Sequence, residues 1–599
     1  MKKYKFFALA FAALTLGACS SDDVVDNGQG GIVPAGEPGY VSLAINLPTQ
    51  PSSRANDDFS NGEAVEYNVN NGYLLLFAGS SESSATFQSA YSLTDELGTW
   101  NDRQEGSNIT TSSRIIKEIT RPSVSGNIYA FVILNGSGVV NEGTNETTGW
   151  QYCGNSLSGN TTLATLTSTA ISPDIATIAN RSDDGNFLMT NAPLFSAPGG
   201  TSAPTGGTVS TFSVVDPDNI YSTQAEAERL EPAANIYVER AVAKVTVTGT
   251  TSGTSPLTYS IAGWTLDVTN NSTYLVRNVN PQTAWWEYKS TDAGVNDYRF
   301  VGSNPVATGL YRTYWGIDPN YNGQDYGQTP FTMLEGGVPS TLTLTGDTNP
   351  LYCFENTFNV ANMIQNQTTR VVVAADLELA GADGTSHDFY TVRGNTSTIY
   401  DGKEDVEALV KKAYLENATI AAAINNATMT GPGVKIGESD LDVTFDSKVS
   451  TGGYLTVTEI SVNDDGAAKF ADGVPAALQD ANNNAIVTAI SEDLNIAYYK
   501  GGRSYYPVMI RHFDESQTPW NLASGQTESY PTPNAEQNWL GRWGVLRNNW
   551  YQINVTGVSQ IGYPEVPEVP GSYDDPVESW IAVQINVLSW AVRTQEAEL

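Results

Sequence analysis

The chain has 599 residues, with 65 acidic and 30 basic side chains and a formal net charge of −35. Nucleic-acid phosphates are bound by an excess of lysine and arginine side chains, and the large acidic excess of this chain excludes nucleic acid as an expected partner. Its 40% hydrophobic and 10% aromatic content is too high for a disordered protein, and its length predicts several domains.

The N-terminus has the pattern of a bacterial lipoprotein signal. A basic stretch, Met1–Lys5, precedes the apolar run Phe6–Leu16, which is shorter than the roughly 20 residues that span a bilayer. Small residues then lead to Cys19, as in a lipobox. We therefore expect a signal peptide over residues 1–18 and a lipid on Cys19 that attaches the precursor to the outer membrane.

The first predicted strand covers Tyr40–Leu47. Its apolar residues alternate with small or polar ones, which is typical of a half-buried strand. The apolar set is Val41, Leu43, Ile45 and Leu47.

A segment rich in proline, serine and asparagine follows this strand and contains Arg54, the only basic residue between Cys19 and Arg103. Exposed segments of this composition are where proteases cut. Cleavage between Arg54 and Ala55 would release the first strand and leave an open edge in its sheet.

Most of the remaining chain also has β-strand patterns. The apolar runs Tyr73–Phe77 and Ile128–Asn135 predict strands that are covered on both faces. A second set of strands begins at Asn235–Val247, after a stretch rich in glycine, proline and serine. We place a domain boundary between residues 200 and 236. One helix is predicted over residues 403–425, where apolar residues recur at helical spacing.

The C-terminus combines an unusual spacer with a last strand. Residues 563–576 contain four prolines and four acidic residues, which favours an extended, solvated segment. The next residues alternate again, with Ile581, Val583, Ile585 and Val587 on one face before Trp590. This strand either folds back into its own sheet or pairs with another molecule.

Residues that could perform chemistry are scarce. The chain has two histidines, His387 and His512, and neither lies in a context that suggests a catalytic triad. Residues 480–484 begin like a calcium loop, but the required glycine and final glutamate are missing. We expect no catalytic residues, no metal and no cofactor. Apart from Cys19, the cysteines are Cys153 and Cys353, which are either buried thiols or a disulfide.

Several segments together resemble the fimbrillins, the lipoprotein-derived subunits of type V pili in Bacteroidales-type bacteria. The segments are the lipobox, Phe187–Asn191, Val238–Val245, Tyr505–His512 and Gly544–Val555. The spacer and the last strand most resemble those of minor-fimbrillin-type shaft subunits. The chain departs from the expected pattern in having Ser589, rather than proline, before the terminal tryptophan.

The resemblance implies a mostly β fold with two β-sandwich-like (transthyretin-like) domains, a few short helices and no enzymatic activity. It also implies an assembly route. An arginine-specific protease cuts between Arg54 and Ala55, and the last strand of another copy replaces the first strand. The product is a cell-surface fimbrium for adhesion, with accessory tip and anchor fimbrillins as further partners. The implied organisation is a signal peptide (1–18), a removed propeptide (19–54), two domains (55–220 and 221–562) and a spacer with the donor strand (563–599).

Two other functions fit the same sequence. The chain is an accessory tip or anchor fimbrillin if it lacks one of the two exchange steps. Alternatively, it is a surface lipoprotein that binds glycans on aromatic side chains such as Trp285 and Trp286.

Overall fold

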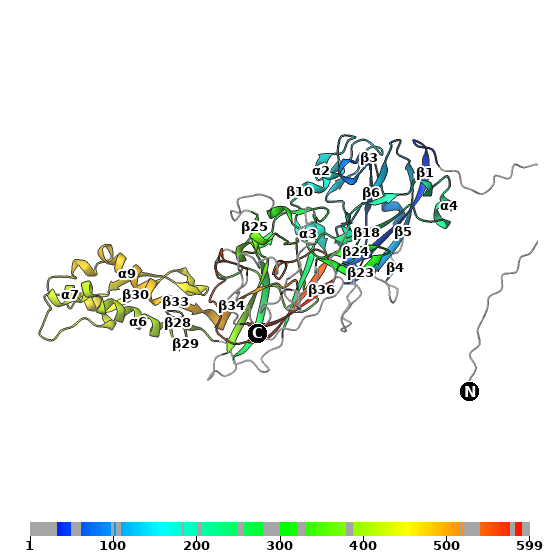
Figure 1. The fold of residues 1–599 in the computed structure, drawn as a ribbon. Helices are drawn as coiled ribbons and strands as arrows, with labels where there is room; N and C mark the ends of the chain where they lie inside the picture. Colours follow the sequence, from blue (N-terminus) through cyan, green and yellow to red (C-terminus); the bar gives the residue numbers. More distant parts are fainter. Residues whose placement is uncertain are drawn as a thin grey trace, which may run out of the picture.

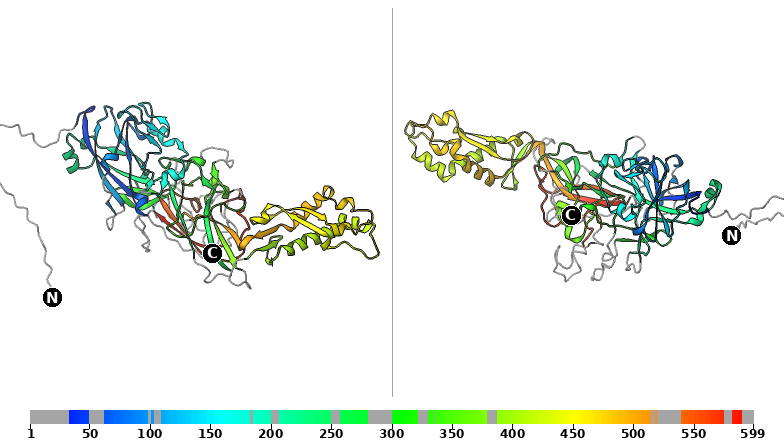
Figure 2. Two further views of the ribbon diagram at one scale, coloured as in Figure 1. Left: turned by 180° about the vertical axis from the view of Figure 1, so that it is seen from behind. Right: turned by 90° about the horizontal axis from the view of Figure 1, so that it is seen from above.

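The computed structural model describes residues 33–48, 62–97, 101–102, 109–182, 185–199, 207–249, 257–279, 300–321, 330–334, 336–378, 387–513, 518, 539–574 and 581–589. These residues form three parts arranged in a row (Figures 1 and 2). A β-rich first part and a β-rich second part adjoin each other, and a lobe of helices and strands extends from the second part.

The first part is built on a ten-stranded sheet with the main order β3-β2-β6-β13-β18-β1-β5-β4; β16 also pairs with β6, and β17 with β1. The strands are β1 (Pro38–Pro48), β2 (Gly72–Gly79), β3 (Thr86–Ser92), β4 (Asn101–Asp102), β5 (Ile109–Thr120), β6 (Asn127–Leu134), β13 (Met189–Asn191), β16 (Ser213–Val215), β17 (Ile220–Tyr221) and β18 (Ala234–Arg240).

Short elements complete the first part. They are α1 (Ala64–Tyr67), α2 (Leu163–Ser168), α3 (Ile175–Ile178), α4 (Gln224–Arg229), β7 (Val140–Asn141), β8 (Gln151–Tyr152), β9 (Asn155–Ser156), β10 (Ala170–Ile171), β11 (Ala179–Asn180) and β12 (Asn186–Phe187). The continuous apolar runs of β2 and β6 are buried along their length, as the sequence predicts.

The second part is a sandwich of two sheets, β26-β19-β35-β36 and β20-β27-β34. Alternate side chains of both sheets fill one core, for example Val245 and Ile553 from the first sheet and Val373 from the second. The strands are β19 (Ala243–Gly249), β20 (Thr258–Asp267), β26 (Leu351–Cys353), β27 (Arg370–Glu378), β34 (Arg503–Met509), β35 (Asn549–Val558) and β36 (Ile581–Ser589).

Further strands form small sheets that are separate from the two sheets of this sandwich. They are β14 (Leu194–Phe195), β15 (Val209–Ser210), β21 (Thr269–Asn270), β22 (Thr273–Tyr274), β23 (Val301–Ala307), β24 (Leu310–Thr313) and β25 (Phe331–Thr332).

The lobe comprises residues 389–499 and has a hydrophobic core of its own. Its elements are β28 (Phe389–Val392), β29 (Asn395–Tyr400), α6 (Lys403–Glu416), α7 (Ala418–Asn426), β30 (Leu441–Phe445), β31 (Gly453–Leu455), β32 (Val457–Val462), α8 (Asp464–Ala467), α9 (Asp480–Leu494) and β33 (Ile496–Tyr499). This independent core was not predicted from the sequence.

The helix predicted over residues 403–425 consists of two helices. Asn417 has an extended backbone conformation, which ends α6, and its side chain accepts hydrogen bonds from the backbone N–H groups of Thr419 and Ile420 to begin α7. Asparagine competes with helix hydrogen bonds in this way, which explains the break. The segment that begins like a calcium loop belongs to helix α9.

The described elements confirm a mostly β fold with few helices. The first core includes Val242 and the second begins at Ala243, while Leu275, Val276 and Phe354 also pack in the first core, and the boundary expected after residue 220 stays a prediction. The strand β18, which follows that boundary, still belongs to the first sheet. Among the described residues, no helix is long and apolar enough to cross a membrane.

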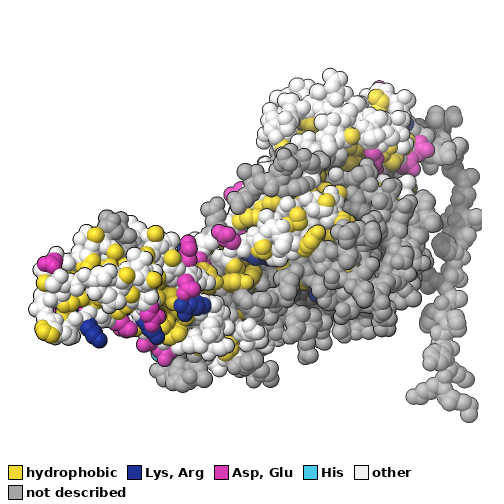
Figure 3. Space-filling model, turned by 60° about the vertical axis from the view of Figure 1, so that its left-hand side comes forward, with side chains coloured by type: hydrophobic (Ala, Val, Ile, Leu, Met, Phe, Trp, Pro, Cys, Tyr) yellow, Lys and Arg dark blue, Asp and Glu magenta, His cyan; other side chains and the backbone are white. Residues whose placement is uncertain are grey.

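The net negative charge is not gathered into one patch on the face of the lobe shown in Figure 3. Acidic and basic side chains lie scattered there among hydrophobic and uncharged ones.

Candidate functional site

The first strand occupies an interior position in its sheet. Over most of its length β1 pairs with β5 in antiparallel orientation, and from Leu43 to Asn46 it also pairs with β18 in parallel orientation. Its predicted apolar side chains, Val41, Leu43, Ile45 and Leu47, are each at most 1% exposed. Removing β1 would therefore open a slot lined by two unpaired strand edges and an apolar floor.

The opposite face of β1 is covered at one position by helix α4. Ser42 is completely buried, and its Oγ accepts a hydrogen bond of 2.5 Å from Nε of Arg114 on β5. Arg114 also donates to the carbonyl oxygens of Ala227 and Leu230 at the end of α4. Figure 1 shows α4 beside β1 at the end of the first part that lies away from the lobe. This cover was not predicted from the sequence; the only local signal for it is a serine at an alternate position of an apolar strand.

The last strand lies at the edge of the second part. Strand β36 pairs in antiparallel orientation with β35 over its whole length, from Ser589 opposite Asn549 to Ile581 opposite Val558. The register shift in this pair falls between Val555 and Gly557, not at the Val587–Leu588 step that interrupts the alternation. In this chain the last strand therefore folds back into its own sheet, which is one of the two alternatives left open by the sequence.

Residues 563–574, here called the strap, contact the protein at several points: Pro564, Val566 and Asp574 are buried, whereas Glu568 and residues 570–573 are exposed, as expected for a solvated spacer. Tyr563 exchanges backbone hydrogen bonds with Tyr505, and the N–H of Val566 donates to Gly337. The carboxylate of Glu565 lies 2.8 Å from the Lys448 ammonium group of the lobe. Prolines cannot donate backbone hydrogen bonds, but Tyr563, Val566 and Asp574 of the strap donate theirs to the second part.

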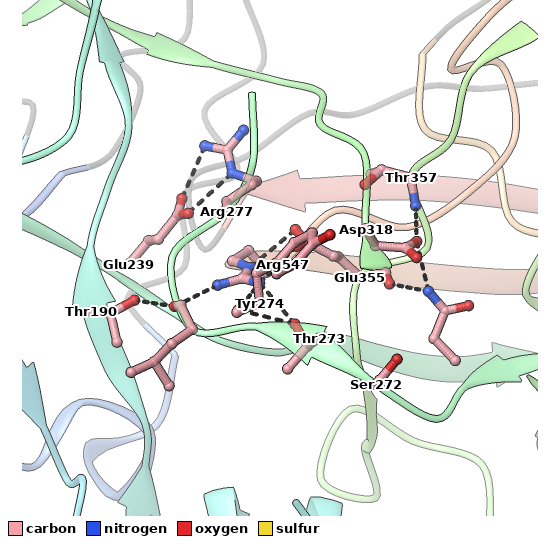
Figure 4. A network of polar contacts seen from close by, with 12 residues as sticks. Thr190, Glu239, Ser272, Thr273, Tyr274, Arg277, Asp318, Glu355, Thr357 and Arg547 are labelled. Atoms are coloured by element: carbon pink, nitrogen blue, oxygen red, sulfur yellow. Dashed lines mark hydrogen bonds and ion pairs between the residues drawn. The ribbon is translucent and has the colours of Figure 1, made fainter. Parts of the chain in front are cut away.

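A network of buried polar side chains joins the first part to the second (Figure 4). Arg547 makes a two-pronged ion pair with Glu355, with Nη2 2.6 Å from Oε1 and Nε 3.0 Å from Oε2. The same guanidinium group donates to the carbonyl oxygen of Leu275, which also accepts from Thr190 of β13. The carbonyl group thus links the two parts.

Two further ion pairs cross this border. Glu239 of β18 accepts from Nε and Nη2 of Arg277 at 3.0 and 3.1 Å. Glu66 of α1 lies 2.6 Å from the Lys244 ammonium group on β19. Breaking a buried pair leaves an uncompensated charge, so these contacts hold the two parts in one arrangement. The motif Val238–Val245, which the sequence offered as a family feature, supplies Glu239 and Lys244.

Asp318 is a buried carboxylate surrounded by hydrogen-bond donors. Oδ1 accepts from the backbone N–H and side-chain amide of Asn320, and Oδ2 accepts from Asn270 and the N–H of Thr357. Burial raises the pKa of Asp318 to about 8, while these donors act in the opposite direction.

The remaining predicted residues have individual outcomes. His512 is buried, with Nδ1 2.8 Å from the Tyr551 hydroxyl and Nε2 2.9 Å from the Tyr314 carbonyl oxygen. Cys153 and Cys353 are free thiols, and burial raises the pKa of each to about 12. In the described ranges, no three histidine, cysteine, aspartate or glutamate side chains are grouped as in a metal site.

Several predicted residues lie outside the described part of the chain. They are Cys19, Arg54, Ala55, Trp285, Trp286 and Trp590. Their roles therefore stay predictions from the sequence.

Residues 497–596 match the family described as "Major fimbrial subunit protein type IV, Fimbrillin, C-terminal". The match includes β34, β35, the strap and β36, and it confirms the resemblance to fimbrillins over this part of the chain. No curated protein matches the sequence.

Solved structures with some similarity include a fimbrilin from Porphyromonas gingivalis W83, with 12% identity, coverage of 92% of this chain and 98% of that chain, and a TM-score of 0.33. Another is a putative cell adhesion protein from Bacteroides eggerthii DSM 20697, with 10% identity, coverage of 94% and 98%, and a TM-score of 0.32. A tip fimbrial protein from Porphyromonas gingivalis has 9% identity, coverage of 92% and 100%, and a TM-score of 0.28. TM-scores of this size do not support a transfer of function.

Proposed function

We propose that this chain, whose residues 497–596 match the fimbrillin C-terminal family, is a structural subunit of a surface fimbrium that polymerises by exchange of β-strands. The precursor carries a lipid on Cys19 and is held at the outer membrane. An arginine-specific protease cuts between Arg54 and Ala55, and the polymer then serves adhesion.

The observation that carries this proposal is the interior position of β1. The only covalent link from β1 to the rest of the fold runs through residues 49–61, which contain Arg54. After a cut there, β1 would be held only by noncovalent contacts, namely backbone pairing to β5, β18 and β17, its buried side chains and the hydrogen bond between Ser42 and Arg114. Cleavage would therefore allow β1 to leave the interior of its sheet.

The energetics favour replacement of β1 over an empty slot. Burial of each large aliphatic side chain contributes about 1.5–3 kcal/mol, and β1 has four of them facing the core. An open slot would expose the apolar side chains that β1 covers. It would also expose the edges of β5 and β18, and unpaired strand edges are templates for pairing with another chain. The C-terminal strand, with Ile581, Val583, Ile585 and Val587 at alternate positions, has the side-chain pattern that fills such a slot.

A first experiment uses purified full-length protein with Cys19→Ser to prevent lipidation. We expect an arginine-specific protease to produce Ala55 as the new N-terminus and to convert monomers into ladders on gels run without heating. The matched control, Arg54→Ala, should stay monomeric under the same digestion. Cleaved protein that has lost residues 19–54 and still fails to assemble would contradict the proposal.

A second experiment tests the donor. Deletion of residues 577–599 should leave a folded monomer that is cut after Arg54 but cannot extend a chain. Normal polymerisation of this truncated protein would show that the donor strand lies elsewhere. Sequencing of the surface-exposed protein separates the alternatives, because a lipidated Cys19 at its N-terminus would favour an anchor subunit or a glycan-binding lipoprotein.

A further inference from the structure

The first and last strands of the chain share more than alternation. Residues 40–47 read Tyr-Val-Ser-Leu-Ala-Ile-Asn-Leu, and residues 580–587 read Trp-Ile-Ala-Val-Gln-Ile-Asn-Val. Aligned in this order, both begin with an aromatic residue, have aliphatic residues at the same four places, a small residue at the third place and asparagine at the seventh.

The side chains of β1 that point away from the core differ in how much room surrounds them. Ser42 is completely buried beneath Arg114 and α4, whereas the side chain of Ala44 is partly exposed. The place of Ser42 therefore admits only a small side chain, while the place of Ala44 leaves room for a longer one. Interiors respond to added volume of even a few atoms by strain or displacement.

We propose, on the basis of the proposed strand exchange, that residues 580–587 of a second copy enter the slot in a single register, each in the place of residues 40–47. Ala582 then occupies the place of Ser42 under α4, Gln584 extends to solvent from the place of Ala44, and Asn586 takes the place of Asn46.

The buried position of Ser42 also disfavours other registers of the donor strand. A shift of two residues in one direction puts Trp580 where Ser42 lies, and a shift of two in the other direction puts Gln584 there. A shift of one residue turns the aliphatic face away from the core. The cover formed by Arg114 and α4 is thus a specificity-determining feature that selects the register.

The seventh place supports the same alignment. Asn46 is buried, and its Nδ2 donates to the carbonyl oxygen of Ala44 at 3.2 Å and lies 3.5 Å from that of Ile236 on β18. In the position of Asn46, the side-chain amide of Asn586 would have the same acceptor, the carbonyl oxygen of Ile236 on β18.

The register can be measured by disulfide trapping in polymers. In β1, Asn46 is the partner of Ser112 on β5, so we expect a donor with Asn586→Cys to cross-link to an acceptor with Ser112→Cys. Side chains directly opposite have Cβ atoms about 4.5–5.5 Å apart, and diagonal neighbours are about 7–8 Å apart. Donors with Gln584→Cys or Leu588→Cys, tested against the same acceptor, should therefore cross-link at least fivefold less.

These outcomes separate the register from the strand exchange itself. Polymers that cross-link best through residue 584 or 588 would overturn the register and leave the exchange intact. Absence of polymers in the unmodified protein after verified cleavage would overturn the exchange. Donors mixed with acceptors that retain Ser112 give the background from Cys153 and Cys353.

A matched pair of substitutions tests the cover directly. Ala582→Leu should reduce the yield of polymer at least tenfold, whereas Gln584→Leu should change it less than twofold. Arg114→Ala in the acceptor should restore part of the yield for the Ala582→Leu donor, because it opens the cover, and unfolding curves of the monomers exclude a folding defect. An Ala582→Leu donor that assembles at least as well as the Gln584→Leu donor would overturn the proposal.

Discussion

The ammonium group of Lys244 lies 2.6 Å from Oε1 of Glu66, and both side chains are at most 1% exposed. The pair joins α1 of the first part to β19 of the second. The hydroxyl of Tyr352 donates to the same carboxylate oxygen at 2.6 Å, and the ammonium group also lies over the ring of Trp550.

Removal of one member of this pair should destabilise the protein strongly. Glu66→Gln or Lys244→Met leaves the other charge buried without its partner, which typically costs about 3–5 kcal/mol. The double variant Glu66→Gln with Lys244→Met should recover much of this loss. Urea unfolding of the three variants measures the effect, and additive losses in the double variant would contradict the coupling.

The same pair predicts a loss of stability in acid. Burial raises the pKa of Glu66, but Lys244, Tyr352 and the N–H of Glu63 lower it by more, so the pKa of this carboxyl lies below the ordinary value of a glutamate. Below that value the unfolded chain binds more protons than the folded one, so stability falls as the pH drops towards the folded pKa. Urea midpoints between pH 7 and pH 3 should decline less steeply in Glu66→Gln than in the unaltered protein.

Asp318→Asn should be destabilising although it preserves the shape of the side chain. All four groups that contact Asp318 donate hydrogen bonds, so at pH 9, above the Asp318 pKa of about 8, an amide NH₂ group would face donors where the ionised carboxylate accepts. An unsatisfied buried group costs about 1–3 kcal/mol. The exposed Asp465 offers a control, since Asp465→Asn should change the midpoint of thermal unfolding little. Equal midpoints for both variants would contradict the assigned role.

Asn417→Ala should loosen the lobe without affecting the other parts. The side chain of Asn417 caps α7, and loss of such a cap costs about 0.5–2 kcal/mol. Hydrogen exchange should accelerate in the amides of α7 and remain unchanged in β2 and β6. Asn425→Ala, which replaces an exposed residue within α7, should leave the exchange unaltered or slower.

The strands were the most predictable elements because their signals are local. The alternation of Val41, Leu43, Ile45 and Leu47 determines which face of β1 is buried, and the structure confirms that face. The alternation from Ile581 to Val587 likewise predicts β36. Neither pattern reveals which strands lie alongside, since pairing depends on residues far away in the sequence.

The contacts between the parts could not be predicted for the same reason. Arg547 and Glu355 are 192 residues apart, and no spacing rule connects them. The prolines and acidic residues of the strap predict exposure, which residues 568 and 570–573 have, but they do not predict that the N–H groups of Tyr563 and Val566 bind the second part. The cover over Ser42 requires α4, which lies far along the chain from β1.

The lobe begins and ends at neighbouring residues. Phe389 of β28 and Tyr499 of β33 are directly paired, and their rings are stacked with centroids 4.4 Å apart. A chain that leaves and re-enters at one place can lengthen, shorten or replace the intervening residues without rerouting any strand of the sandwich. The lobe is therefore a module whose residues can change without altering the strand order of the sandwich from which it extends.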